Sequence, residues 1–139
     1  MQAYWYAIVA MLFWGIGPVF GKIGLAELEP IPAMVIRAWV ITALLTGFAL
    51  VGGHGRELLS VNPRAALFVI MEGMCAAFLG QLAFYYALKY GEVSQVSPIA
   101  SAFPVVAMVI AVIFLGEQLT AAKVVAAGLI VSGIILLKY

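Results

Sequence analysis

Residues 94–115 read SQVSPIASAFPVVAMVIAVIFL, and no charged side chain occurs in this stretch. A helix needs about 20 apolar residues, at about 1.5 Å of rise each, to cross a hydrocarbon core of about 30 Å. The stretch therefore predicts a transmembrane helix. Four further apolar runs of similar length surround it, and we expect five spans near residues 3–22, 31–52, 65–88, 94–115 and 120–138.

The composition of the whole chain agrees with these spans. Apolar residues make up 66% of the sequence and charged residues 9%, where soluble domains carry about 25% charged residues. Mean hydropathy is +1.18. The sequence therefore predicts an all-α integral membrane protein, with five transmembrane helices in a single domain over residues 1–139. The connections fall at turn residues and charges, over residues 24–30, 52–64, 89–93 and 116–119.

Several classes of function are disfavoured by the residues that the chain lacks. A net charge of +1 gives no basic patch for a nucleic acid. His54 is the one histidine and Cys75 the one cysteine, so no metal-ligand motif can be assembled from these residue types. Aspartate is absent, which removes the usual catalytic triads. We therefore expect no catalytic residues, no metal site and no cofactor, and a protein that is not an enzyme.

The basic residues are divided evenly between the two membrane faces. With a cytoplasmic N-terminus, one face carries three Lys or Arg and the other face also carries three. The first set is Arg56, Arg64 and Lys123, and the second is Lys22, Lys89 and Lys138. Because Lys and Arg near span ends set orientation, this balance is compatible with insertion in both orientations, followed by pairing of inverted copies. Alternatively, the N-terminal amine and the Arg56–Arg64 loop bias the chain to one orientation.

Short motifs spread along the chain point to a family. They are Leu12-Phe13-Trp14-Gly15, Arg37, Tyr85-Tyr86-Ala87-Leu88, Ser97-Pro98, Phe103-Pro104 and Phe114-Leu115-Gly116-Glu117-Gln118-Leu119-Thr120. Together they resemble one EamA-type repeat of the drug/metabolite transporter superfamily, over essentially the whole chain. Most members carry two inverted five-helix repeats, whereas this chain carries one. The resemblance therefore implies a single-repeat protein that must dimerise, or half of a longer transporter, and the balanced charges independently favour an antiparallel dimer.

Two spans carry candidate substrate-binding residues beside prolines. In the fourth span Ser97, Pro98 and Ser101 share one face, and Pro98 and Pro104 each remove a backbone donor. Unwound backbone at membrane depth is tolerated inside protein or beside a cavity, so this face predicts either a cavity wall or a helix-packing surface. Trp14 lies far from either interface, and is either packed on neighbouring glycines or a stacking surface for an organic solute.

The second and third spans supply the remaining candidates, Arg37, Glu72, Gln81 and Tyr85. Gln81 and Tyr85 share one face of the third span, and Glu72 and Tyr86 lie on roughly the opposite face. Ionisable groups inside a membrane usually pair or line a water-filled path. Arg37 and Glu72 descend from opposite faces, so we expect them to interact across an antiparallel dimer. Alternatively, Arg37 snorkels to its interface and Glu72 is protonated or satisfied within its own bundle.

Small residues predict where helices approach closely. Gly73, Ala77 and Gly80 in the third span suggest helix packing, and Gly128 and Ser132 form a small-xxx-small pair in the fifth span. We expect this second pair at a dimer or inter-repeat contact. Thr120 is placed to cap the fifth span.

The expected function is transport of a small organic solute by alternating access, as an antiparallel homodimer around a site near the midplane. The expected partners are the solute, the lipid bilayer and a second copy in inverted orientation, in the cytoplasmic (inner) membrane of a prokaryote. Proton coupling would be plausible through Glu72. Two alternatives stay open: a lipid-linked sugar flippase subunit of the same superfamily, and a non-transporting assembly partner of a larger membrane protein.

Overall fold

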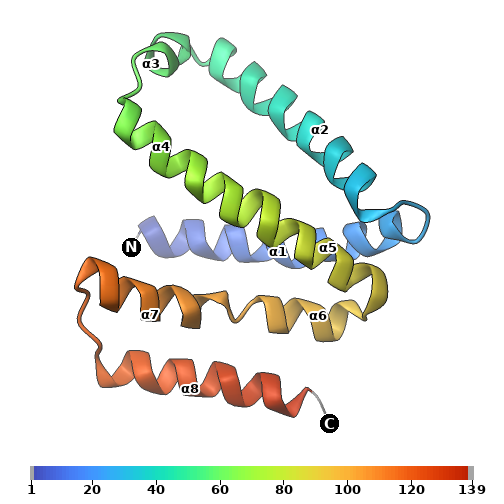
Figure 1. Cartoon of the computed structure of the whole chain (residues 1–139), viewed down its shortest axis with the longest axis vertical. Coiled ribbons are helices and arrows are strands. Elements are labelled where there is room, and N and C mark those ends of the chain that lie inside the picture. Colours follow the sequence, from blue (N-terminus) through green and yellow to red (C-terminus); the bar gives the residue numbers. More distant parts are fainter. Residues whose placement is uncertain (1, 138–139) are drawn as a thin grey trace. The chain divides into compact units, whose positions relative to one another are not determined.

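The computed structural model describes residues 2–137, and most of them are helical (Figure 1). Four helical segments are long and apolar enough to cross a bilayer: α1 (Gln2–Leu25), α2 (Pro30–Val51), Pro63–Tyr90 and Val93–Leu115. A shorter apolar helix, α8 (Ala121–Leu136), follows. No strand occurs among residues 2–137. The prediction of an all-α membrane protein is confirmed.

The expected span bounds agree with the helices to within a few residues. The largest difference is at α1, which ends at Leu25, three residues beyond the expected end at residue 22. The shortest of the five apolar segments is α8, whose 16 residues measure about 24 Å, somewhat less than the hydrocarbon core. The expected fifth span ran to Lys138, which lies outside the described residues. Thr120 caps α8 as predicted, because its side chain accepts a hydrogen bond from the Lys123 amide.

The third span is not one continuous α-helix. It consists of α4 (Pro63–Glu72), the π-helix η1 (Gly73–Gly80) and α5 (Gln81–Tyr90). The Gln81 amide donates to the carbonyl of Ala76, five residues back. The assumption of 3.6 residues per turn is therefore wrong between Glu72 and Gln81, because a π-helix rotates less per residue than an α-helix. The opposite-face relation predicted for Glu72 and Gln81 depended on that assumption, so the structure gives it no support.

The fourth span is interrupted about a third of the way along its length. It is divided into α6 (Val93–Ala100) and α7 (Phe103–Leu115) by a turn at residues 101–102. Pro98 lies inside α6, and Pro104 lies in the first turn of α7. Because each proline lacks an amide hydrogen, the regular ladder of helical hydrogen bonds is weakened on both sides of the turn. The interruption agrees with the unwound backbone that these prolines predicted.

The connection between α2 and α4 contains a helix that the sequence did not indicate. Residues 52–64 were expected to form a loop, yet α3 (Gly55–Leu59) lies within them. Gly53 precedes it with a φ of 74°, a left-handed conformation that suits glycine. Asn62 ends the connection by capping α4, with its side-chain oxygen accepting from the Arg64 amide.

The described residues form two compact units, one of residues 20–90 and one of the remaining described residues. In the 20–90 unit α2 packs on α5, and from there α2 and α4 diverge towards α3 (Figure 1). In the other unit α7 packs on α8. Leu25, Leu88 and Pro30 are the fully buried side chains among residues 2–137, and all three belong to the 20–90 unit.

Two lysines join the ends of α1 and α5, an arrangement that we call the lysine clasp. Lys22 Nζ donates to the carbonyl of Leu88 at 2.7 Å and to that of Lys89 at 3.4 Å. Lys89 Nζ donates to the carbonyls of Leu25 at 2.9 Å and Leu28 at 3.0 Å. Each ammonium group thus lies at the C-terminal end of the other helix, where the helix dipole favours positive charge.

Candidate functional site

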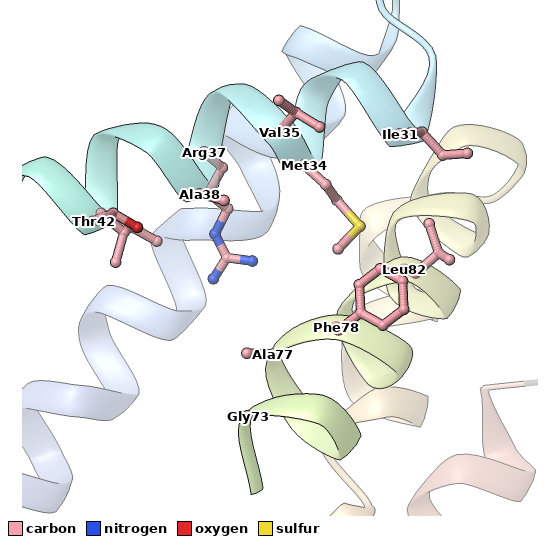
Figure 2. A pocket seen from close by; sticks show the side chains of 11 residues that line it. Ile31, Met34, Val35, Arg37, Ala38, Thr42, Gly73, Ala77, Phe78 and Leu82 are labelled. Atoms are coloured by element: carbon pink, nitrogen blue, oxygen red, sulfur yellow. The ribbon is translucent and has the colours of Figure 1, made fainter. Parts of the chain in front are cut away.

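A pocket of about 480 Å³ lies between α2 and the η1–α5 part of the third span, entirely within the 20–90 unit (Figure 2). Small-molecule sites typically have volumes of about 300–1,000 Å³. The pocket is partly open, and its walls are mainly apolar. Its lining includes Met34, Arg37, Ala38 and Thr42 from α2, and Gly73, Ala77, Phe78 and Leu82 from the third span.

Arg37 brings a charge into this apolar space. Figure 2 shows its guanidinium pointing from α2 into the space between the helices, towards the side that carries Ala77. The guanidinium carbon lies 5.9 Å from the centroid of the Tyr85 ring, which is within the range of a cation–π contact. The structure therefore brings together two of the residues predicted from sequence, although they are 48 positions apart in the chain.

Among the polar candidates of this unit, Arg37 lines the pocket, whereas Tyr85, Gln81 and Glu72 do not. Gln81 is half-buried at the start of α5, and Glu72 is exposed at the end of α4, directly before the lining residue Gly73. Within residues 2–137 Arg37 and Glu72 form no ion pair. Their interaction across a dimer concerns a second chain and stays a prediction.

Trp14 lies on α1 in the other unit, with 69% of its surface exposed. A Cβ added at Gly15 or Gly17 would meet no atom within 4 Å, so no described helix of the same unit approaches closely at these glycines. The helix α1 continues through Pro18, which has no amide hydrogen to donate to the Trp14 carbonyl one turn earlier. The indole is therefore accessible to a solute, to lipid or to a second chain.

The two candidate serines of the fourth span differ in their surroundings. The Ser101 hydroxyl donates to the carbonyl of Ser97 at 2.7 Å, so it is occupied within its own helix. The Ser97 hydroxyl oxygen is buried and has no hydrogen-bond partner among the described residues. Buried hydroxyls normally have partners, so Ser97 is the stronger candidate of the two for contact with a solute or water.

Gly128 and Ser132 lie one turn apart on the exposed surface of α8. The Ser132 hydroxyl donates to the Gly128 carbonyl at 2.8 Å, which satisfies its polar group within the helix. A Cβ added at Gly128 would meet no atom within 4 Å. Within the described chain this small-residue surface is therefore open, and the dimer contact predicted there stays a prediction.

Sequence reasoning missed most of the pocket. Gly73 and Ala77 were assigned to close helix packing, whereas the structure places them on the wall of a cavity opposite α2. Met34 and Phe78 carry no polar group, and nothing distinguishes such residues from lipid-facing ones in an apolar run. The small residues could have indicated the pocket, because small side chains also leave space between diverging helices.

Comparison with known proteins gives a family for the chain. The model of the EamA-like transporter family matches residues 1–139, which confirms the resemblance of the motifs. A relative named "Uncharacterized transporter in cobO 3'region", from Sinorhizobium sp., is 28% identical over 132 residues, or 95% of this chain and 93% of the relative. An uncharacterized protein of Methanocaldococcus jannaschii is 27% identical over 131 residues, or 94% of this chain and 92% of the relative. No solved structure matches the chain significantly.

Proposed function

We propose that this chain, which belongs to the EamA-like transporter family, moves a small organic solute across the membrane by alternating access as an antiparallel homodimer. In this proposal residues 1–139 act as a single five-helix repeat, and the second copy supplies the inverted repeat. The observation that carries the proposal is the pocket between α2 and the third span, which places a guanidinium among apolar helices of a transporter family. The proposed location is the cytoplasmic membrane of a prokaryote.

The balance of basic residues and the loose packing support a partner copy. Three Lys or Arg fall on each expected membrane face, so neither orientation is favoured. Leu25 and Leu88 are the buried hydrophobic residues among residues 2–137, while large apolar side chains on every span are exposed. Lipid can cover such surfaces, and so can a second chain. The two relatives are matched over nearly their whole length, so chains of about one repeat recur among similar proteins.

Within this proposal the predicted residues take different parts. Arg37 lines the pocket and contacts the ring of Tyr85, and Gln81 lies one turn before Tyr85 on α5. Trp14, Ser97 and Ser101, which belong to the other unit, are further candidates for contact with the solute. Glu72 provides a carboxylate for proton coupling. Gly128 and Ser132 form the open surface of α8 that contacts the partner copy.

Flux measured with the purified protein in liposomes tests transport. We expect saturable uptake of at least one member of a panel of amino acids, organic anions, organic cations and nucleosides. Arg37→Gln should lower that uptake, whereas Arg64→Lys, at the start of α4 and outside the pocket, keeps the charge balance and should not. Absence of flux for every solute would favour the assembly-partner alternative, and flux of a polyprenyl-phosphate sugar alone would favour the flippase.

Disulfide crosslinking tests the antiparallel dimer. Cys75 is exposed and lies close to position 72 in the chain, so it is first replaced by serine. In that background Arg37→Cys and Glu72→Cys are introduced on separate chains and co-expressed. We expect a disulfide-linked dimer, because an inverted copy brings these positions to nearly the same depth. Crosslinks that form only when both cysteines are on one chain would contradict the antiparallel arrangement.

A further inference from the structure

We infer that the pocket between α2 and the η1–α5 segment binds an amphipathic organic carboxylate, with the carboxylate at Arg37 and the apolar body along the third span. The inference rests on the proposed function, since it assigns a substrate class to the same pocket. It goes further because it excludes organic cations and neutral solutes as ligands of that pocket.

The charge of the pocket is positive and unbalanced. Arg37 is the one ionisable residue in the lining, and neither ion pair found within residues 2–137 involves it. Its Cα lies seven residues from Pro30, or about 10 Å along α2 from the start of the helix. An ionised group at this depth requires a counter-charge or water. An anionic ligand would supply the counter-charge, whereas a cation would be repelled.

The geometry at Arg37 leaves its hydrogen-bonding capacity available. Tyr85 lies 5.9 Å from the guanidinium carbon, and within residues 2–137 the guanidinium donates no hydrogen bond to protein. The cation–π contact is an electrostatic attraction to the ring, and the five N–H donors of a guanidinium lie in its plane. In-plane N–H pairs match the two oxygens of a carboxylate, and the resulting bonds are charge-assisted.

The rest of the wall determines what must be attached to the carboxylate. Met34, Phe78 and Leu82 are apolar, and Gly73 and Ala77 leave space between α2 and the third span (Figure 2). A sugar would leave most of its hydroxyl groups without partners on such a wall. An apolar chain or ring has no polar groups to leave without partners there, and burial of its surface is favourable. A phospholipid phosphate belongs at the interface rather than about 10 Å below it, so we commit to a soluble carboxylate.

Binding to the purified full-length protein in detergent tests the inference. The probes are 3-phenylpropanoate and hexanoate, each compared with its amide and with the amine of equal chain length. We expect at least one carboxylate to raise the thermal midpoint, with its amide binding about tenfold or more weakly and its amine not at all. Arg37→Gln should weaken the carboxylate about tenfold or more, while the matched variant Arg64→Gln should bind normally.

A second variant covers the case in which Arg37→Gln does not fold. Ala77→Leu retains the guanidinium and fills the space opposite it, so it should also weaken the carboxylate about tenfold or more. Carboxylates that bind no better than their amides, or that bind normally to Ala77→Leu, would overturn the inference. So would a thermal shift produced by phosphatidylglycerol and by neither soluble carboxylate.

The inference and the proposed function fail differently. If the wild-type protein transports a cation or a neutral solute and Arg37→Gln transports it equally well, transport stands and the carboxylate assignment is wrong. If carboxylate binding depends on Arg37 and Ala77 but liposomes show no flux of any solute, the pocket assignment stands and transport is wrong.

Discussion

Replacing Lys89 with methionine should destabilise the protein by about 2–4 kcal/mol, because methionine keeps the aliphatic stem and removes the ammonium group of the lysine clasp. Hydrogen bonds from a charged donor contribute about 1.5–3 kcal/mol each. The Leu25 carbonyl belongs to a buried residue, so its 2.9 Å bond should contribute within that range. Leu28 is exposed, so its carbonyl can bind water after the substitution. Its hydrogen bond to Lys89 therefore contributes less to stability. The ion pair with Glu29, which is 70% exposed, adds about 0–1 kcal/mol.

Lys22→Met tests the other half of the clasp. Its 2.7 Å bond to the carbonyl of the buried Leu88 predicts a loss of about 1.5–3 kcal/mol. The double variant should lose less than the sum of the two single losses, because removing either lysine already loosens the helix ends to which the other lysine binds. Such a shortfall would show that the two lysines act as one unit.

The assay is unfolding of the purified protein in mixed micelles, followed by helical circular dichroism. Lys123→Met is the matched control, since this lysine also bonds a carbonyl and a glutamate, but at an exposed site on α8. We expect the control to lose about 1 kcal/mol or less. If Lys89→Met and Lys123→Met agree within about 0.5 kcal/mol, the clasp does not hold α1 and α5 together.

Three further predictions address topology, the π-helix and the fourth span. Two C-terminal reporters, one active only inside the cell and one only outside, should both give signal. Two arginines added to the 89–93 connection should leave signal from one reporter, and signal from one reporter in the unmodified chain would contradict dual orientation. Ala at Gly80 would place its Cβ 3.1 Å from a backbone carbonyl, whereas Ala at Gly73 meets open space, so Gly73→Ala should be the more stable by about 1 kcal/mol in thermal unfolding. Equal stabilities would show that η1 does not require glycine at position 80. Ser97→Ala removes a buried hydroxyl without a described partner, so it should preserve stability and lower liposome flux if that hydroxyl contacts the solute; Ser97→Leu should insert normally and lower flux further.

The lysine clasp also affects how orientation should be manipulated. Lys22 and Lys89 were expected to act as charges that set topology, but the structure shows that both bind helix carbonyls. Removing either one would change orientation and stability together. Adding arginines to the 89–93 connection changes the charge balance without removing either lysine of the clasp, which is why the topology prediction uses added charge.

The sequence by itself determined the class of protein, the bounds of its spans and its family. Span lengths are set by the thickness of the bilayer, and ends are marked locally by proline, glycine and charge, as at Pro30 and Gly116. The cap at Thr120 was equally readable, because it depends on residues three positions apart. These features need no information about which helix lies beside which.

The tertiary structure decided everything that depends on contacts between distant residues or on small differences in backbone register. The lysine clasp joins positions more than 60 residues apart, and the contact of Arg37 with Tyr85 requires α2 to pack on α5. The π-helix has no sequence signature here, because π-helical and α-helical hydrogen bonding differ little in energy within an otherwise helical run. The pocket is therefore a property of two diverging helices, because apolar residues such as Phe78 become lining only when a second helix leaves space opposite them.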